Sequence, residues 1–212
     1  MKKIISIVGA GGKTTLVHRL AEEYRRKGQS VLVTTTTHMF VEADTDLSCD
    51  FFAVKEKIKK RGYCMAGAKC KAETSSAVVK KQISKTRQAS IQQEKMQGIP
   101  YGLLDKIIRE MSDELDYVII EADGARHHSL KYPAADEPVI YPGTTDIIIV
   151  LGIWEKGKAC GDVVFRHELM QQELGIAPDR IVDDELIETL RRVYVDKLRK
   201  MGFKDHIETI IS

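Results

Sequence analysis

The chain begins with an apolar, β-branched run that enters a glycine-rich turn and then an amphipathic helix. Residues 4–8 read Ile-Ile-Ser-Ile-Val, residues 9–12 read Gly-Ala-Gly-Gly, and Lys-Thr-Thr follows. A strand, a glycine turn and a helix in this order direct backbone N–H groups outward at a helix N-terminus, where the helix dipole favours an anion. The segment therefore predicts a phosphate-binding loop that opens a βαβ unit.

The loop supplies side chains as well as backbone groups for a bound nucleotide. Lys13 adds a mobile positive charge for the β- and γ-phosphates, and the Thr14 hydroxyl is placed to hold Mg²⁺. The common loop has a further glycine where Ile7 stands, so the match is to the shorter Gly-x-x-Gly-Lys-Thr. An ordinary strand-to-helix turn is the alternative, and three glycines in four residues argue against it. The predicted nucleotide-binding residues here are Gly9, Ala10, Gly11, Gly12, Lys13, Thr14 and Thr15.

Hydrophobic periodicity predicts alternating strands and helices along the rest of the chain. An apolar stripe from Leu16 to Tyr24 indicates a helix that Gly28 ends. Further helices are expected at 103–115, 163–174 and 184–201, strands at 30–33, 51–54, 63–66, 117–120 and 147–152, and loops at 39–50 and 130–140. Residues 1–212 are therefore expected to form one α/β domain, with three layers and a mainly parallel sheet like that of P-loop NTPases.

Composition narrows the class and the location. The chain is 43% apolar and 30% charged, as is usual for a soluble protein. The first residues lead directly into a strand rather than a secretory leader, and no run approaches the ~18 apolar residues of a membrane span. The four cysteines lack the paired C-x-x-C spacing of a zinc site. We expect reduced thiols in a cytoplasmic protein that does not enter a membrane.

Positive charge is concentrated in residues 55–95, which hold twelve Lys and Arg against three Asp and Glu, although the whole chain carries a net charge of +2. We expect a variable basic insertion or lid at 55–97, whose polar stretch 72–96 fits a helix, a hairpin or a lid. Such a segment can bind an anionic cofactor, nucleic acid or an acidic protein, and a solvated face is the alternative. No aromatic residues alternate with the lysines, which argues against nucleic acid.

A second informative element is a buried apolar strand that ends in Glu-Ala-Asp-Gly-Ala-Arg at 121–126. Glu121 and Asp123 lie two residues apart, so on an extended chain they point the same way, toward the phosphate loop at the same sheet edge. They are expected to hold Mg²⁺ and to orient an attacking water. Gly124 would let the backbone turn close to phosphate, and Arg126 would neutralise charge in the transition state. A surface turn with paired acids is the alternative.

Four threonines at 34–37, followed by His38, stand at the predicted carboxyl end of the second strand, the edge where ligands bind in open α/β sheets. A hydroxyl there could reach Mg²⁺ or sense the γ-phosphate, and we assign Thr35 and Thr36 to the nucleotide site. Threonine is also a good strand former, so part of the run is structural. His38 fits proton transfer, partner binding or an ordinary loop position. The expected metal ligands are Thr14, Thr36, Glu121 and Asp123.

Three segments together resemble one family. They are Gly-Ala-Gly-Gly-Lys-Thr-Thr at 9–15, Thr-Thr-Thr-Thr-His at 34–38, and residues 121–140, which include Leu-Lys-Tyr-Pro and Asp-Glu-Pro-Val-Ile. From residue 1 to about 175 the chain is similar to the YqeC family, described as accessory proteins of selenium-dependent molybdenum hydroxylases. The resemblance implies a P-loop NTPase-like fold, a part in maturing the hydroxylase or its cofactor, and a molybdopterin-type ligand.

The resemblance also assigns roles residue by residue. It adds Lys131 to the nucleotide site, a residue whose charge could otherwise belong to the surface. Where the family often has a histidine before Pro138, this chain has Asp136 and Glu137. The chain contains no Asn-Lys-x-Asp element for reading guanine, so ATP and GTP are both candidates. The residues carried over are 9–15, 35–38, Glu121, Asp123, Gly124, Arg126 and Lys131.

The sequence leaves three functions open. The first is an accessory factor that binds ATP or GTP with Mg²⁺, hydrolyses it slowly and acts on a molybdenum hydroxylase or a cofactor-synthesis protein. Proteins of this kind often dimerise across the nucleotide. The second is a small-molecule kinase or a fragment of a Mur-like ligase, which shares Gly-x-x-Gly-Lys-Thr-Thr but needs further domains. The third is a module that binds nucleotide without hydrolysis, against which the carboxylate pair argues.

Overall fold

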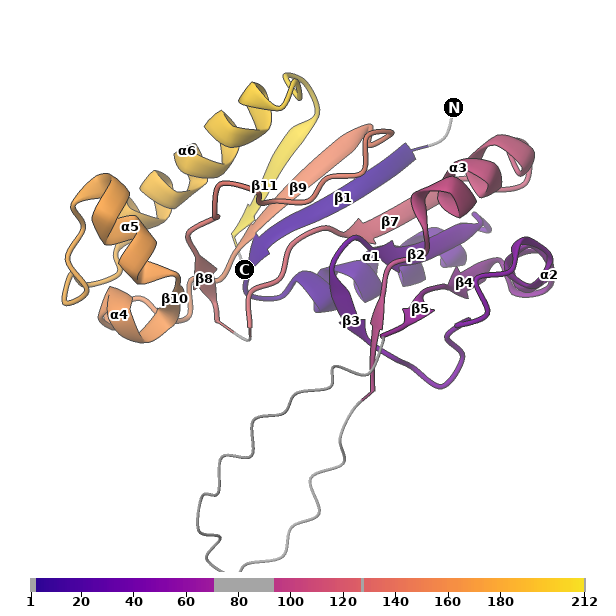
Figure 1. The fold of residues 1–212 in the computed structure, drawn as a ribbon, viewed down its shortest axis with the longest axis horizontal. Coiled ribbons are helices and arrows are strands. Elements are labelled where there is room, and N and C mark those ends of the chain that lie inside the picture. Colours follow the sequence, from indigo (N-terminus) through magenta and orange to yellow (C-terminus); the bar gives the residue numbers. More distant parts are fainter. Residues whose placement is uncertain (1–2, 71–93, 127, 212) are drawn as a thin grey trace, which may run out of the picture.

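The structure is a computed structural model that describes residues 3–70, 94–126 and 128–211. Its centre is a six-stranded sheet in the order β11-β9-β1-β7-β2-β4, in which every neighbouring pair is parallel (Figure 1). The strands are β1 Lys3–Ala10, β2 Val31–Thr35, β4 Tyr63–Met65, β7 Tyr117–Glu121, β9 Asp146–Leu151 and β11 Ile207–Ile211. The predicted α/β fold with a mainly parallel sheet is confirmed.

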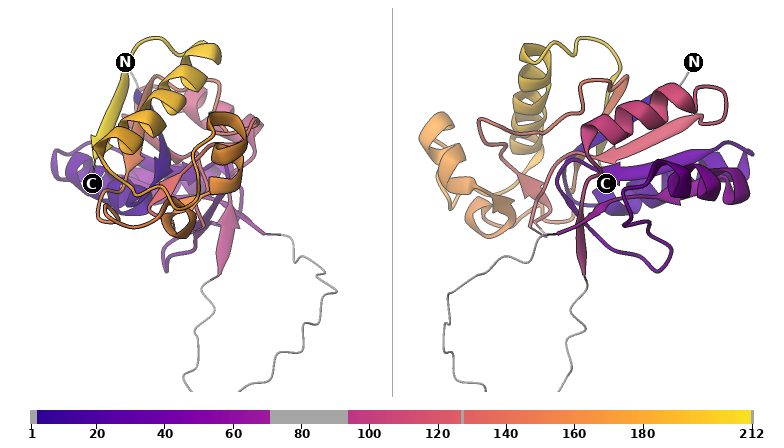
Figure 2. Two further views of the ribbon diagram at one scale, coloured as in Figure 1. Left: turned by 90° about the vertical axis from the view of Figure 1, so that its left-hand side faces the viewer. Right: turned by 45° about the vertical axis from the view of Figure 1, so that its right-hand side comes forward.

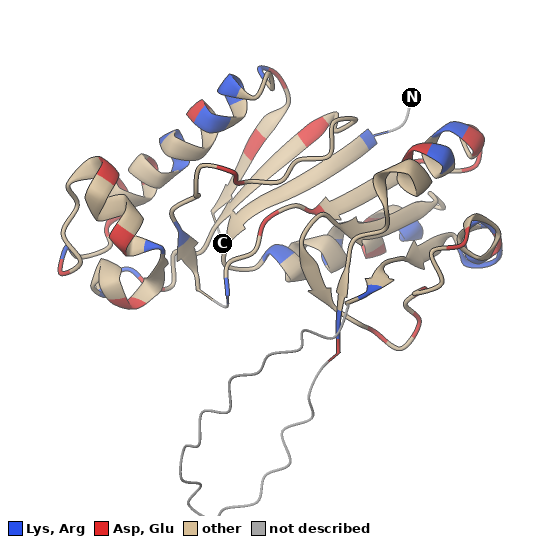
Figure 3. Ribbon diagram, in the orientation of Figure 1, with Lys and Arg blue, Asp and Glu red and all other residues tan. Residues whose placement is uncertain are grey.

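Helices cover both faces of this sheet (Figures 1 and 2). α1 (Lys13–Arg26) packs on one face, and α2 (Phe51–Arg61), α3 (Tyr101–Glu110) and α6 (Asp184–Lys200) pack on the other. Because successive side chains of a strand point to opposite faces, β1 contributes Ile5 to the core on the α1 side and Ile4 to the other. Charged residues lie mainly on helices and loops, and the central strands contain few of them (Figure 3). The result is a three-layer domain.

The chain leaves the neighbouring strands β1 and β7 in opposite directions. β1 continues through α1 to β2, on the far side of β7, whereas β7 continues to β9, on the far side of β1. A divergence of this kind opens a crevice at the carboxyl ends of the two strands, where ligands bind in open α/β sheets. The glycine loop (residues 9–12) and Glu121 both lie there, because one ends β1 and the other ends β7.

Two small sheets flank the crevice. β3 (His38–Phe40), β6 (Lys95–Gln97) and β5 (Ala68–Lys69) form an antiparallel sheet in this order. β8 (Leu130–Lys131) pairs with β10 (Val164–Phe165), which lies between the short helices α4 (Cys160–Val163) and α5 (His167–Leu174). The expected 55–97 insertion therefore divides. α2 and β4 belong to the main domain, β5 and β6 form the small sheet, and residues 71–93 fall outside the described residues.

The strand predicted at 51–54 is wrong, because these residues begin α2. Phe51, Val54 and Ile58 are buried at the three- and four-residue spacing of a helix. The Asp50 carboxylate caps the helix by accepting from the Ala53 N–H at 2.8 Å. A short apolar run fits both periods, and the buried positions farther along the chain decide for the helix.

Three smaller expectations also need correction. The loop predicted at 39–50 begins with strand β3, the helix predicted at 163–174 starts only at His167, and β8 interrupts the predicted 130–140 loop. The edge strand β11 was not predicted. Its five residues are at most half-buried, so the strand lacks a continuous buried apolar signal. Within the described ranges, no helix has the length and hydropathy needed to cross a bilayer.

We expect Asp50→Ala to lower the free energy of unfolding by about 1 kcal/mol, because the first turn of α2 loses its side-chain cap. The matched control is Glu56→Ala on the same helix, which removes only an exposed i,i+4 ion pair with Lys60 and should change stability less. Urea denaturation followed by circular dichroism measures both. An effect of Asp50→Ala no larger than that of the control would contradict the capping role.

Candidate functional site

The glycine loop runs so close to β9 that side chains are excluded from it. Gly9, Gly11 and Gly12 have φ values of 91°, 78° and 93°, in the region that favours glycine. A Cβ on Gly9 would lie 2.1 Å from the carbonyl oxygen of Val150, and one on Gly11 would lie 2.7 Å from the Cα of Gly152. Gly9 and Gly11 are therefore required both by backbone conformation and by the lack of space, and Gly12 by its backbone conformation.

Lys13 begins α1 and folds back over the loop. Its ammonium donates to the carbonyl oxygen of Gly9 at 2.9 Å, and only 6% of the residue is exposed. Burial lowers the pKa of Lys13, and the nearby charges of Glu121 and Asp123 partly oppose that shift. Lys13 also lines the cleft described below.

Glu121 and Thr14 face each other across the crevice. The Thr14 hydroxyl donates to a carboxylate oxygen of Glu121 at 2.9 Å. Burial raises the pKa of Glu121, and the charge of Lys13 and the hydrogen bond from Thr14 oppose this. The Thr35 hydroxyl and the Thr36 N–H both donate to the Glu121 carbonyl oxygen, at 2.6 and 3.1 Å, and so fix its backbone. A hydroxyl beside a carboxylate is a partial ligand set for Mg²⁺.

Asp123 lies behind the loop, fully enclosed by protein. One carboxylate oxygen accepts from the Gly9 N–H at 3.1 Å and from the Tyr194 hydroxyl at 2.8 Å. The other oxygen accepts from the ammonium of Lys131, which is itself buried. Lys131 also pairs with Glu137 at 2.7 Å. Asp123 and Lys131 thus hold the start of the loop and do not line the cleft.

Glu137 and Arg166 extend this network to the cleft surface. The guanidinium of Arg166 contacts both carboxylate oxygens of Glu137. Burial alone would raise the pKa of Glu137, but the hydrogen bonds from Arg166 and Lys131 outweigh it and lower the pKa. Lys131 also donates to the carbonyl oxygen of Gly124 at 2.6 Å. Buried charges therefore connect the glycine loop to β10 and α5.

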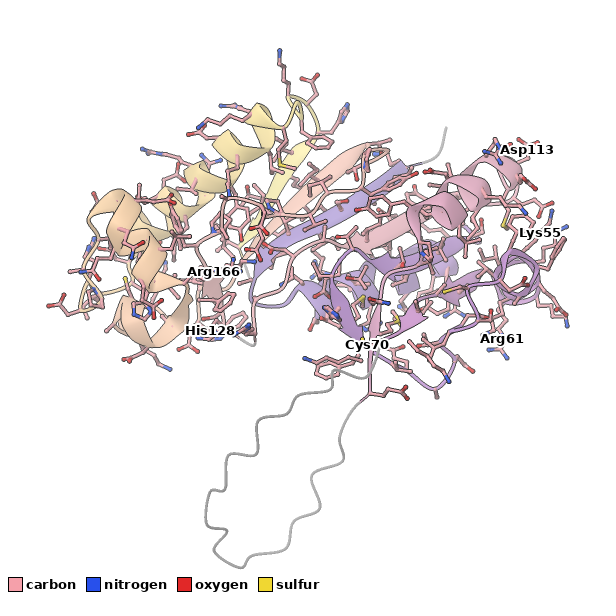
Figure 4. The ribbon with its side chains drawn as sticks, in the orientation of Figure 1. Lys55, Arg61, Cys70, Asp113, His128 and Arg166 are labelled. Atoms are coloured by element: carbon pink, nitrogen blue, oxygen red, sulfur yellow. The ribbon has the colours of Figure 1, made fainter. Side chains whose placement is uncertain are left out.

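A cleft of about 1350 Å³ opens at this edge of the sheet. In Figure 4, His128 and Arg166 lie on the α5 side of the cleft, and Cys70 lies near the sheet β3-β6-β5. The predicted site residues that line it are Gly11, Gly12, Lys13, Thr14, Thr15, Glu121, Gly124 and Arg126. Those that do not are Gly9, Ala10, Thr35, Thr36, Asp123 and Lys131.

Of the range 35–38 that the resemblance carries over, Thr37 and His38 line the cleft, whereas the assigned residues Thr35 and Thr36 do not. The Thr36 hydroxyl instead donates to the carbonyl oxygen of Val139 at 2.6 Å. Sequence reasoning missed Trp154, Phe165 and Arg166, which also line it. Trp154 follows the carboxyl end of β9, and the carboxyl ends of such strands are where ligands bind in open α/β sheets. Phe165 and Arg166 carry no comparable local signal.

No group of three or more His, Cys, Asp or Glu side chains in the described ranges is arranged to hold a metal ion by itself. Mg²⁺ bound with a nucleotide uses only one or two protein ligands and takes the rest from phosphate and water. The side chains of Thr14 and Glu121 fit that smaller requirement.

The fold and the site define an α/β protein in which a glycine loop, a lysine and a buried carboxylate meet at one edge of a parallel sheet. The chain belongs to the YqeC family, since residues 5–168 match the family described as "YqeC protein". It is 32% identical over 178 residues to "Uncharacterized protein YqeC" of Escherichia coli (strain K12), covering 83% of this chain. The match covers 62% of that relative's length. No solved structure matches the chain.

Tyr194→Phe tests the network behind the loop. We expect it to lower the free energy of unfolding by about 1.5–3 kcal/mol, because a buried carboxylate loses a hydrogen bond while the ring volume is kept. The control is Tyr101→Phe, at a partly exposed residue on α3, with an expected change within about 0.5 kcal/mol. Urea denaturation measures both. Equal values would show that the hydroxyl of Tyr194 contributes nothing specific.

The raised pKa of Glu121 predicts the pH dependence of stability. Above its ordinary value of 4.5, the unfolded chain ionises this carboxyl before the folded protein does, so ionisation costs the folded state stability. The melting temperature of Glu121→Gln minus that of the wild type should therefore increase as pH rises from 4.5. This difference should become constant above the folded-state pKa of Glu121. Glu56→Gln is the control, because the hydrogen bond to Lys60 lowers the pKa of Glu56, so its contribution to stability changes below pH 4.5 and its difference from the wild type should stay nearly constant between pH 4.5 and pH 8. A difference for Glu121→Gln that does not change between pH 4.5 and pH 8 would contradict this account.

Proposed function

We propose that this protein binds a nucleoside triphosphate with Mg²⁺ at the glycine loop and hydrolyses it slowly. The observation that carries the proposal is the contact of Thr14 with Glu121 at 2.9 Å, placed beside Lys13 in one cleft. A hydroxyl, a carboxylate and an ammonium around a helix N-terminus are what Mg²⁺ and the β- and γ-phosphates require. Each group comes from a segment that the fold brings to the β1–β7 crevice.

Different groups of the site would bind the phosphates, hold the metal ion and position the loop. The N–H groups of the loop and of the first turn of α1 would hold the phosphates, with the helix dipole in their favour. The ammonium of Lys13 would exchange the Gly9 carbonyl for a phosphate oxygen. Thr14 and Glu121 would hold the metal ion, which would supply charge neutralisation at the phosphates. The oxygens of Asp123 already accept from three donors, so we assign it to positioning the loop rather than to the metal.

Hydrolysis would depend on Glu121 and Arg126. The Glu121 carboxyl is 7% exposed and faces the cleft, where it can orient a water molecule for attack on the γ-phosphate. Arg126 is exposed and also lines the cleft, and its guanidinium lies 5.5 Å from the centre of the Phe165 ring. From there it can approach charge that develops on the transferred phosphoryl group.

We include the accessory role in the proposal because the three motifs resemble those of the family. A molybdopterin-type cofactor is anionic, and the cleft walls carry Lys95, Arg126 and Arg166. The partner would be a molybdenum-dependent, selenium-dependent hydroxylase or a protein that makes its cofactor.

One observation favours a small-molecule kinase as the second candidate. The cleft volume of about 1350 Å³ exceeds the roughly 300–1,000 Å³ of ordinary ligand pockets, which leaves space for an acceptor beside the nucleotide. Phosphate transferred to an added alcohol or acid, rather than to water, would select this function.

Thermal shift with ATP and GTP, with and without Mg²⁺, tests nucleotide binding. A nucleotide at about 100 times its dissociation constant should stabilise the wild type by about 2.7 kcal/mol. Lys13→Ala should abolish the shift, because the ammonium is lost from the loop. Lys27→Ala is the matched control on the exposed end of α1 and should keep the shift. If neither nucleotide shifts the wild-type protein, the proposal is wrong.

Glu121→Gln separates binding from hydrolysis. We expect this variant to bind nucleotide while phosphate release falls at least about tenfold, because the amide cannot accept a proton from water. Phosphate release is followed under single-turnover conditions and binding by thermal shift. Unchanged hydrolysis would remove Glu121 from the reaction, and complete loss of binding would make it a ligand of the metal–nucleotide complex alone.

A further inference from the structure

Trp154 is the single tryptophan of the chain, and 57% of it is exposed. It follows β9 and lines the same cleft as the glycine loop. An indole ring carries a large apolar area, and a protein normally uses it in the core or at a contact. Here the fold leaves much of the ring open toward a cleft that also contains Lys13 and Glu121.

The indole ring stands directly beside the glycine loop. A Cβ on Gly152 would lie 2.8 and 3.0 Å from two atoms of the six-membered ring of Trp154, so this ring packs on the Gly152 backbone. The Gly152 N–H in turn donates to the carbonyl oxygen of Ala10 at 3.2 Å. Gly11 approaches the same backbone so closely that it has no room for a Cβ. One glycine residue therefore separates the indole from the phosphate-binding backbone.

The two phenylalanine rings that line the described cleft each have a cation over them. The ammonium of Lys95 lies 5.2 Å from the centre of the Phe40 ring. The guanidinium groups of Arg126 and Arg166 lie 5.5 and 4.8 Å from the centre of the Phe165 ring. Within the described residues, no ring or cation stacks on Trp154. A flat ligand in this cleft can therefore occupy the open face of the Trp154 ring.

We propose that Trp154 stacks on the base of the nucleotide whose phosphates the glycine loop holds. This inference rests on the proposed function and names the specificity-determining residue of that site. Stacking accepts every base because each has a π-face, and it favours the larger purines. The site would therefore prefer purine nucleotides over pyrimidine nucleotides and over bare polyphosphate, and would discriminate little between ATP and GTP.

Fluorescence of the single tryptophan provides a direct test. ATP, GTP, CTP and inorganic tripolyphosphate are titrated with Mg²⁺ into the full chain. ATP and GTP should quench Trp154 in a saturable way and with similar affinity, CTP more weakly, whereas tripolyphosphate should bind by calorimetry without comparable quenching. Trp154→Ala should weaken ATP binding about 10- to 100-fold and leave tripolyphosphate binding unchanged. Trp154→Phe should restore most of the ATP affinity.

Phe52→Ala is the matched control, because Phe52 is an exposed aromatic residue on α2, outside the lining of the cleft. ATP affinity should not change in this variant. Equal ATP affinity of Trp154→Ala and the wild type, while both still bind tripolyphosphate, would overturn the stacking inference and leave the phosphate site standing. If the wild type binds neither ATP nor tripolyphosphate, the proposed function is wrong, and the stacking inference is wrong with it.

Discussion

The buried pairing of Asp123 with Lys131 is the interaction on which the site depends. A charge away from water is tolerated only when other groups compensate it, and here each partner is fully enclosed. Asp123 also accepts from the backbone of Gly9 and from Tyr194, so one carboxylate joins the end of β1, strand β8 and helix α6. The same ion pair therefore stabilises the domain and sets the position of the glycine loop.

This pairing also explains why the two acids after β7 differ in role. Sequence reasoning placed Glu121 and Asp123 on the same side because residues two apart in a strand share a face. β7 ends at Glu121, so the rule no longer applies at Asp123. Glu121 faces Thr14 in the cleft, and Asp123 turns into the protein behind the loop. The chain thus places one acid at the cleft, and the other acid binds the backbone of Gly9.

What the sequence predicted well depends on local patterns. The strand before Gly9, helix α1 and strand β7 each carry a periodic apolar run with a clear end, and all were found as expected. Contacts across long distances were not predictable in the same way. Nothing near Arg166 indicates that it pairs with Glu137, because the two meet only when β10 aligns with β8. Trp154 likewise gains its position from the packing of Gly152 on the loop.

If the loop binds phosphate as we propose, the hydrogen bond from Lys13 to the Gly9 carbonyl adds a selection step that precedes any recognition of shape. A ligand must draw the ammonium of Lys13 away from the Gly9 carbonyl oxygen, to which the ammonium already donates. A neutral oxygen offers no gain over the carbonyl, whereas an anionic oxygen offers a stronger attraction in this poorly solvated place. Sugars and bases alone would leave the lysine where it is. In the proposed function, the loop would therefore admit only ligands with enough negative charge to displace this hydrogen bond, and the rest of the cleft would then distinguish among them.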